Sequence, residues 1–582
     1  MNAPARPQPR PVRSPEGVPD SRGLNAFHAD PSFRGLLELH LPSKLFAHLL
    51  PHFEALGAMV GTELDELALE ADKNPSVLVS EGERQSVRKP ASYRKLEEAA
   101  FGTFGLAAMS HRGGVLGWPE PMPAAAKYAM TYLYVQAEFG VCCPLSMTDA
   151  LTRTIRKFAA PALVARFLPG LTAQDMDALT QGAMFMTEQK AGSDVGLVET
   201  MAKQVDGEWR LTGDKWFCSN VDAGLALVLA RPEGAPPGTL GLSLFLLPRN
   251  LPDGSPNRYR IVRLKDKLGT RAMPSGEITL EGASAWLVGD PNQGFKQMAD
   301  MINMSRLSNG MRAAGLMRRA LTEAQFVARN REAFGRRLRD LPLMRRQLLK
   351  LMLPAEAARS FLFYTAAELA KADAGDAVAK KRVRILTPLI KFRACRDARR
   401  ATGDAMEVRG GVGYIEEWSD PRLVRDAHLG SIWEGTSNIV GLDVMRAIRR
   451  EQCLEALLPA LEAEVAALPA PLARPLAASL AKAAAFARDT ALSGDEFHAR
   501  QAATGLYYAV AAIRLGTEGV ALGAKGDGRR LLLAALAWLH RLAPRDPLAR
   551  EPSGLEAELA EALLPETPVP MDAVGRILSR LA

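Results

Sequence analysis

Residues 186–195 read Met-Thr-Glu-Gln-Lys-Ala-Gly-Ser-Asp-Val and lie where the spacing of apolar residues along the chain changes. Before them, residues 35–180 carry apolar side chains at intervals of three and four, the period of an amphipathic helix. After them, short apolar or alternating runs are separated by Gly, Pro, Asn and Asp, which is typical of antiparallel strands. We therefore predict a β-domain, a sheet or small barrel, over residues 181–293, after an N-terminal α-helical domain.

The helical period returns at residue 294. Residues 294–450 contain four long segments rich in Ala, Leu, Met and Arg, which predict a helical bundle. Prolines then introduce an extra helical domain, residues 451–582. The Pro- and Arg-rich residues 1–34 are predicted to form a disordered leader; an organellar transit peptide is the alternative. The expected fold is mainly α with a central β-domain.

Composition limits the class of protein. Apolar residues make up 47% of the 582, and no uninterrupted apolar run is long enough to span a membrane. The net charge is +8: residues 451–582 hold 13 basic against 16 acidic residues, or −3, and the rest holds 60 against 49, or +11. The net positive charge of residues 1–450 favours the binding of an anionic ligand. Five irregularly spaced cysteines and eight scattered histidines predict no disulfide framework and no metal, and indicate a cytoplasmic location.

Four short segments combine residue types that suit a cofactor site. They are 187–194 (hydroxyls and glycine in a loop), 215–220 (Lys-Trp-Phe-Cys-Ser-Asn), 331–335 (Arg-Glu-Ala-Phe-Gly) and 432–438 (Ile-Trp-Glu-Gly-Thr-Ser-Asn). Arginine pairs well with phosphate, and a helix start behind the last segment favours anions. Taken singly, each is more often a turn, a core aromatic pair or a solvated surface residue. No Rossmann glycine pattern or P-loop is present, so a nucleotide must be held in another way.

Taken together and in this order, the four segments and the Gly-Gly-Val-Gly-Tyr loop at 410–414 resemble the acyl-CoA dehydrogenase family. The resemblance covers roughly residues 100–450 and is closer to the AidB-type branch, the adaptive-response flavoproteins linked to DNA alkylation. Residues 143–148, 264–269 and 442–446 carry this closer likeness. The family fold has a helical domain, a β-barrel and a four-helix bundle, the same order that the periodicity predicts.

The resemblance implies FAD as cofactor and a homotetramer in which subunits share it. The residues implied to contact FAD are Met186, Thr187, Gly192, Ser193, Trp216, Phe217 and Ser219 around the flavin ring; Arg331, Phe334, Gly410 and Gly411 toward a neighbouring subunit's FAD; and Trp433, Gly435, Thr436 and Asn438 at the last turn. Ser193 and Arg306 are implied to contact the substrate.

Glu434 matches the catalytic base of the family. An α-proton beside a thioester is only weakly acidic, so hydrogen bonds to the thioester carbonyl must stabilise the developing enolate. A desolvated carboxylate has a raised pKa, which makes it a better matched base. The expected reaction is removal of the α-proton by Glu434 with transfer of the β-hydride to flavin N5.

Some positions depart from the family pattern and leave the function open. Glu407 stands where many members have Gln, and Asn303 replaces an Asp at the CoA site. The alternative to an acyl-CoA dehydrogenase is a DNA-binding flavoprotein with little acyl-CoA turnover. A basic stretch over residues 380–400 supports that alternative, although such runs are usually solvated helix faces. An oxidase of the same fold is a third possibility.

Overall fold

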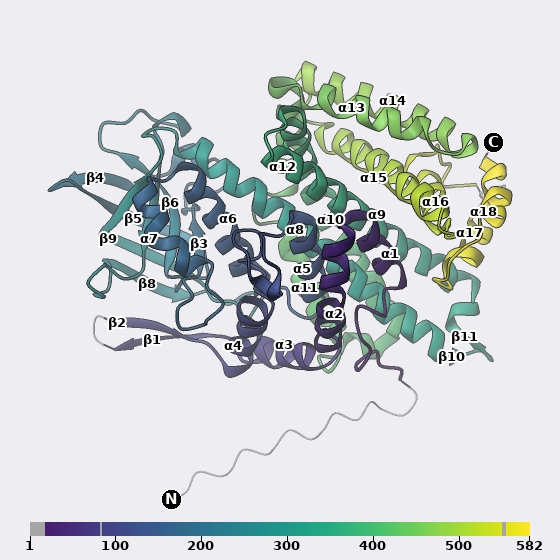
Figure 1. Cartoon of the computed structure of the whole chain (residues 1–582), viewed down its shortest axis with the longest axis horizontal. Helices are drawn as coiled ribbons and strands as arrows, with labels where there is room; N and C mark the ends of the chain where they lie inside the picture. The colour runs from purple at the N-terminus through teal and green to yellow at the C-terminus, as the bar shows by residue number, and fades with distance from the viewer. Residues whose placement is uncertain (1–17, 82–83, 550–553, 582) are drawn as a thin grey trace, which may run out of the picture.

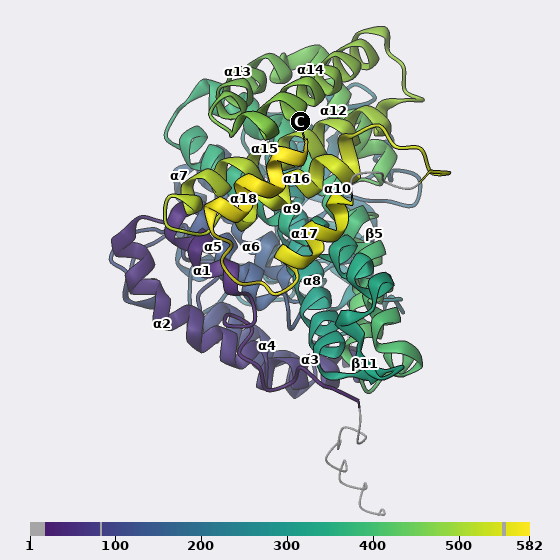
Figure 2. The same ribbon diagram turned by 90° about the vertical axis from the view of Figure 1, so that its right-hand side faces the viewer.

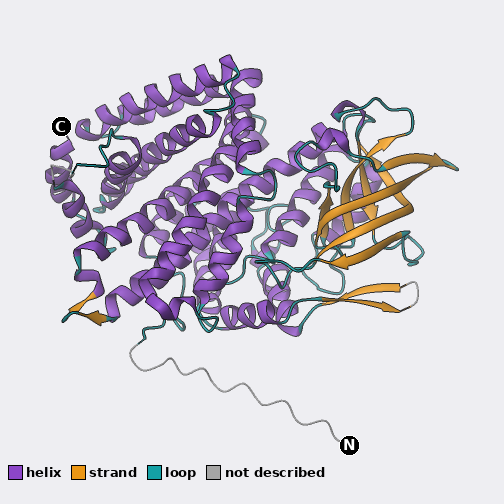
Figure 3. Cartoon of the chain, turned by 180° about the vertical axis from the view of Figure 1, so that it is seen from behind, coloured by secondary structure: helices purple, strands orange, loops and turns teal. Residues whose placement is uncertain are grey.

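We describe a computed structural model of the chain, covering residues 18–81, 84–549 and 554–581. Most strands gather at one end of the molecule, and helices fill most of the rest (Figure 3). In chain order come a helical domain, a β-domain, a helical bundle and further C-terminal helices (Figure 1). The predicted fold class is confirmed. Within the described residues, no helix combines the length and the apolar character needed to cross a membrane.

The N-terminal helical domain includes a hairpin that the periodicity did not predict and that extends beside the β-domain (Figure 1). The helices are α1 (Pro31–His40), α2 (Ser43–Val60), α3 (Glu63–Lys73), α4 (Ala91–Glu97), α5 (Ala124–Tyr134), α6 (Cys142–Phe158) and α7 (Pro161–Leu171). The hairpin consists of β1 (Val77–Glu81) and β2 (Arg84–Arg88).

The segment before α1 is ordered from residue 18 onward. Phe27 and Asp30 are buried, and the Ser21 hydroxyl donates to Glu323 at 2.5 Å. Asp30 forms an ion pair with Arg359 of the bundle. The prediction of a disordered leader up to residue 34 is therefore wrong for residues 18–34, because contacts with distant helices order a segment whose own composition favours disorder. The rest of that leader lies outside the described residues.

The β-domain closes on itself. Its strands are β3 (Gly182–Phe185), β4 (Met201–Val205), β5 (Glu208–Ser219), β6 (Leu225–Pro232), β7 (Ser243–Pro248), β8 (Tyr259–Leu264) and β9 (Ser275–Val288). Pairing runs β6-β4-β5-β9-β7 and returns to β6, while β3 and β8 pair outside this ring with β6 and β9. Buried alternate side chains such as Ala226, Val228 and Phe245 form the barrel core.

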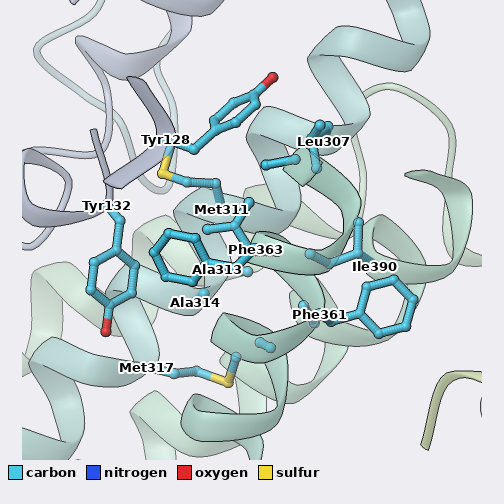
Figure 4. Close-up of a cluster of buried hydrophobic side chains, with 14 of the residues drawn as sticks. Tyr128, Tyr132, Leu307, Met311, Ala313, Ala314, Met317, Phe361, Phe363 and Ile390 are labelled. Atoms are coloured by element: carbon cyan, nitrogen blue, oxygen red, sulfur yellow. The ribbon is translucent and has the colours of Figure 1, made fainter. Parts of the chain in front are cut away.

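The bundle consists of α8 (Gly294–Asn330), α9 (Pro342–Asp373), α10 (Ala377–Arg409) and α12 (Ser437–Glu451), with the short α11 (Ser419–Gly430) before the last. A small hairpin, β10 (Glu332–Ala333) with β11 (Arg336–Arg337), follows α8. Figure 4 shows one cluster of buried side chains that includes Tyr132 of α5, Met311 of α8, Phe361 of α9 and Ile390 of α10. All four are buried, so the N-terminal domain and the bundle share one core.

The C-terminal helices lie against α9, α10 and α12 (Figure 1 and, from the side, Figure 2). They are α13 (Cys453–Ala466), α14 (Ala470–Ser493), α15 (Ala499–Gly523), α16 (Arg529–Ala537), α17 (Leu555–Leu563) and α18 (Met571–Leu578). We call residues 451–581 the appended domain.

A buried ionic network joins the appended domain to the rest. Arg530 pairs with Glu518 at 2.7 Å and with Glu356 at 2.9 Å, and Arg359 pairs with Glu356 at 2.5 Å. Asp30 completes it through Arg359. Every member is almost fully buried. Such a network stabilises the folded state only while all its members are present. Removal of one member leaves its partners charged and unpaired away from water.

Candidate active site

The turn that carries Glu434 lies between α11 and α12 in an unusual backbone conformation. Glu434 has φ +55° and Gly435 has φ +99°, both in the left-handed region. This conformation costs a non-glycine residue about 1 kcal/mol or more, so surrounding contacts must hold it in place. Strain of this kind concentrates at functional sites.

Two cations from neighbouring helices hold the turn by its carbonyl groups. Arg306 Nε donates to the Glu434 carbonyl at 3.1 Å, and Lys391 Nζ donates to the Gly435 carbonyl. Arg306 is in turn fixed by an ion pair with Asp443 at 2.6 Å. Arg306 therefore holds the Glu434 turn in place, and its contact with substrate stays a prediction.

The Glu434 side chain occupies a desolvated position. Its Oε2 atom is buried and has no hydrogen-bond partner, and the same holds for the Ser305 hydroxyl oxygen. Burial raises the pKa of Glu434, and the nearby Ser305 side chain and the cations Lys391, Arg306 and Arg312 offset this only in part. A carboxylate in this environment has the properties of a general base.

Trp433, just before Glu434, packs in an aromatic and cationic stack. Its ring lies parallel to that of Phe139 with centroids 5.9 Å apart. The guanidinium of Arg312 lies 4.6 Å from the Trp433 centroid and 5.4 Å from that of Phe139. The stack fixes the entry to the turn from the side of α8.

On the β-domain side, a buried ion pair anchors the loop that holds the predicted flavin contacts. Lys215 Nζ pairs with Glu188 at 2.6 Å, and Glu188 also accepts from the Thr200 hydroxyl at 2.5 Å. Burial alone would raise the pKa of Glu188, but Lys215 and these donors hold it below its ordinary value. The loop containing Gly192 and Ser193 stays exposed beside this anchor.

We expect Lys215→Met to lower the free energy of unfolding of the β-domain by about 2 kcal/mol, since Glu188 loses a charged donor but keeps its other hydrogen bonds. Chemical denaturation followed by tryptophan fluorescence measures the change. Lys190→Met is the control, because Lys190 pairs with Glu199 in the open, with side chains 73% and 63% exposed. Equal losses in both variants would contradict the anchoring role.

The aromatic pair on β5 faces outward instead of into the barrel core. Trp216 N donates to the Thr187 carbonyl at 2.8 Å, which joins β5 to the loop. Phe217 is 56% exposed, and Lys265 Nζ lies 3.9 Å from the Trp216 ring centroid. The register of β5 shifts between Lys215 and Cys218, which turns this pair away from the barrel.

The segment 265–275 joins the β-domain to α11, because the Thr270 N–H donates to Asp426 at 2.6 Å. Lys267 Nζ donates to the Ser275 hydroxyl at 3.1 Å, and Ser275 shares a hydrogen bond with Ser219 of β5 at 3.3 Å. Lys267 and Glu434 both act electrostatically on the buried thiol of Cys143. Lys267 therefore links the predicted flavin-facing strand, through Ser275, to the electrostatic surroundings of Cys143.

A second group of predicted residues lies elsewhere. Phe334 is 93% exposed, and Arg331 Nη1 donates to the Arg409 carbonyl beside Gly410 at 2.8 Å. An added side chain at Gly411 would meet no atom within 4 Å. Figure 1 places the β10–β11 hairpin at the end of the molecule opposite the β-domain. These residues cannot reach a flavin held beside Trp216 of the same chain.

The basic stretch on α10 is largely turned inward. Arg384 pairs with Asp443 at 2.8 Å, Arg393 pairs with Asp397, Arg382 contacts Glu368, and Lys391 holds the Gly435 carbonyl. Among the nine basic residues between positions 380 and 400, Lys380, Lys381, Arg399 and Arg400 are exposed. The stretch is therefore mainly a packing and positioning element.

Sequence reasoning missed Ser305, Arg312 and Lys391 as neighbours of Glu434. Ser305 and Arg312 are seven residues apart on α8, so they share a helix face, and buried polar residues at that spacing are a usable signal. Lys391 gives no local signal that separates it from the charged residues around it.

Within the described residues, no group of three His, Cys, Asp or Glu side chains could hold a metal ion. All five cysteines are free and buried.

Comparison with known proteins assigns each region. Residues 17–178 match the N-terminal domain of the adaptive response protein AidB, 183–283 the middle domain of acyl-CoA dehydrogenases and 292–449 their C-terminal domain. AidB of Escherichia coli is 36% identical over 433 residues, covering 71% of this chain and 76% of AidB. Acyl-CoA dehydrogenase family member 11 of Caenorhabditis elegans is 31% identical over 437 residues, covering 72% and 70%.

The structure of ACDH-11 from Caenorhabditis elegans, solved in complex with C11-CoA, superposes with a TM-score of 0.83. Its sequence is 25% identical, and the match covers 94% of this chain and 96% of that one. The likeness extends through the appended domain.

A β-domain between two helical domains in chain order, together with a buried carboxylate on a strained turn, defines the class of protein. The chain belongs to the acyl-CoA dehydrogenase family, and its N-terminal domain is of the AidB type.

Proposed function

We propose that this protein is an FAD-dependent dehydrogenase that oxidises the Cα–Cβ bond of an acyl-CoA thioester, with Glu434 as the base. The observation that carries the proposal is the buried, unpartnered Oε2 of Glu434 on a turn fixed by Arg306 and Lys391. Reduction of the purified protein by a panel of acyl-CoAs under anaerobic conditions tests it, because flavin reduction bleaches the visible absorbance.

The residues around the β-domain fit a flavin. Trp216 and Phe217 offer outward-facing rings beside Lys265, and the neighbouring residues Thr187 and Ser219 carry hydroxyl groups. Gly192 leaves open space, since an added side chain there would meet no atom within 4 Å. When bound, FAD supplies the acceptor for the β-hydride.

The chain itself supplies proton transfer and orientation. Glu434 removes the α-proton, and its backbone N–H, which donates to no other protein group in the described structure, is available for the thioester carbonyl. By holding the carbonyl groups of Glu434 and Gly435, Arg306 and Lys391 fix the Glu434 carboxylate relative to the Glu434 backbone N–H. The base is thus oriented before substrate arrives, which lowers the entropic cost of reaction.

The raised pKa of Glu434 predicts an acid limb in the pH profile of kcat/KM. Glu434 acts as a base only when ionised, so activity should fall as pH drops through a value above the ordinary glutamate range of about 4.3. Initial rates between pH 5 and pH 9 measure it. A profile flat down to pH 5 would assign the proton transfer to another group.

We also propose that the FAD site is completed by a second subunit, within a homotetramer. Support comes from Arg331, Phe334 and Gly410, which lie at the end opposite the β-domain, with Phe334 almost fully exposed. Phe334→Ala should lower FAD occupancy, and light scattering reports whether the assembly persists.

Duplex DNA binding is the second candidate. The exposed basic groups Lys380, Lys381, Arg449 and Arg450 favour it, although most of the basic stretch is paired internally. DNA affinity at two salt concentrations distinguishes the functions, since phosphate contacts give steep salt dependence. Salt-sensitive DNA binding without bleaching by any thioester would favour this candidate over the dehydrogenase.

A further inference from the structure

Three arginines with only neutral partners surround the start of α12. Arg396 Nη1 contacts the Ser437 hydroxyl at 3.4 Å, and Arg399 Nη1 contacts the Ser431 hydroxyl at 3.2 Å. Arg500, from the appended domain, donates to Asn438 Oδ1 at 3.2 Å. All three partners belong to the segment that contains Glu434. We call these three side chains the arginine triad.

No member of the arginine triad forms an ion pair with a carboxylate of the described chain. Asp397 is the nearby acid, but it already pairs with Arg393 and accepts from the Tyr508 hydroxyl at 2.7 Å. Burial, followed by repulsion from Arg500, Arg393 and Arg399, lowers the pKa of Arg396. Guanidinium groups gathered in this way repel one another until an anion lies between them.

The backbone of α12 allows Arg500 to come this close. A side-chain Cβ at Gly441 would lie 3.2 Å from Arg500 Cγ and 3.7 Å from its Cα. A side chain at position 441 would force Arg500 Cγ to shift by a few tenths of an ångström, so glycine favours this close approach of α15 to α12. The placement of Arg500 is therefore built into the helix packing and does not depend on a flexible loop.

We propose that the arginine triad binds the phosphate groups of a nucleotide, and that the appended domain contributes to this site through Arg500. Planar guanidinium groups match phosphate oxygens in pairs. The proposal rests on the proposed function for the source of the nucleotide: FAD and a CoA thioester both carry an ADP unit, and either could supply the phosphates.

The test uses the full-length protein and the variants Arg399→Gln and Arg500→Gln, singly and combined. Arg488→Gln is the matched control, because Arg488 is an exposed arginine of the same domain that faces Glu455. Calorimetry with ADP measures nucleotide affinity, and absorbance after reconstitution measures the dissociation constant of FAD. Each triad variant should weaken binding of one of these ligands about tenfold, and the control should not.

Weaker ADP binding with unchanged FAD affinity assigns the site to the thioester's nucleotide, whereas weaker FAD binding assigns it to the cofactor. Unchanged affinity for both in the double variant overturns the proposal, and so does a loss confined to duplex DNA. If the wild-type protein binds no FAD and no thioester bleaches it, but ADP binding still depends on the triad, the proposed function fails while this site stands.

Discussion

Replacing Glu434 with glutamine is expected to lower the rate of acyl-CoA oxidation at least ~100-fold while the protein keeps its flavin. Glutamine has nearly the same shape, so the φ +55° turn and its contacts with Arg306 and Lys391 should persist. The substitution removes only the carboxylate oxygen that would accept the α-proton. Because Glu434 Oε2 accepts no hydrogen bond, the amide group can replace it without breaking one.

Single-turnover reduction by a thioester, followed at the flavin absorbance, measures this effect separately from product release. Glu455→Gln is the control, since it makes the same change in an exposed side chain of α13 and should leave the rate unaltered. If Glu434→Gln is reduced at the wild-type rate with full flavin content, Glu434 is not the base.

The second large effect is expected in stability. Arg530→Met should lower the free energy of unfolding by about 3–5 kcal/mol, the usual cost of breaking a buried ion pair. Arg530 faces both Glu518 and Glu356, and its loss leaves two buried carboxylates with fewer cations. Arg576→Met is the control, because the Arg576–Asp572 pair has side chains 71% and 73% exposed and should contribute about 1 kcal/mol or less.

The pH dependence of this loss gives a further check. Burial alone would raise the pKa values of Glu518 and Glu356, but the arginines hold both well below their usual range. A carboxyl group with a lowered pKa in the folded state stabilises above its unfolded pKa, about 4.3, and loses that contribution as pH falls below it. The difference between wild type and Arg530→Met should thus be full at pH 7 and shrink below about pH 4. A difference that grows on acidification would contradict the role of the network.

The fold could be predicted from the spacing of apolar residues, because each domain repeats one spacing over many residues. The long helices α8, α9 and α10 keep a helical period over their full length, and the β-domain is marked by its turn residues. The hairpin β1–β2 and the order of residues 18–30 were missed, since both depend on contacts with remote parts of the chain.

The candidate site was predictable only in part. Glu434 and Trp216 stand in segments with a recognisable order, whereas the role of Arg306 depends on Asp443, 137 positions away. The basic stretch shows the same limit, because the sequence gives the charges of Lys391 and Arg384 but not their partners. Helix packing decides whether a charged side chain is solvated or bonded to a carbonyl group, and the local sequence pattern does not encode helix packing.

The ionic network also bears on how the protein matures on the ribosome. Asp30 emerges early in synthesis, but its partner Arg359 is 329 residues further along, and Glu518 and Arg530 follow later still. Until these last helices have left the exit tunnel, the nascent chain holds acidic and basic groups that cannot be satisfied in an interior. Release of a polypeptide truncated before α15 would therefore leave Glu356 without Arg530 and would expose the apolar faces of α9 and α12 that the appended domain covers, which is the kind of surface that chaperones bind.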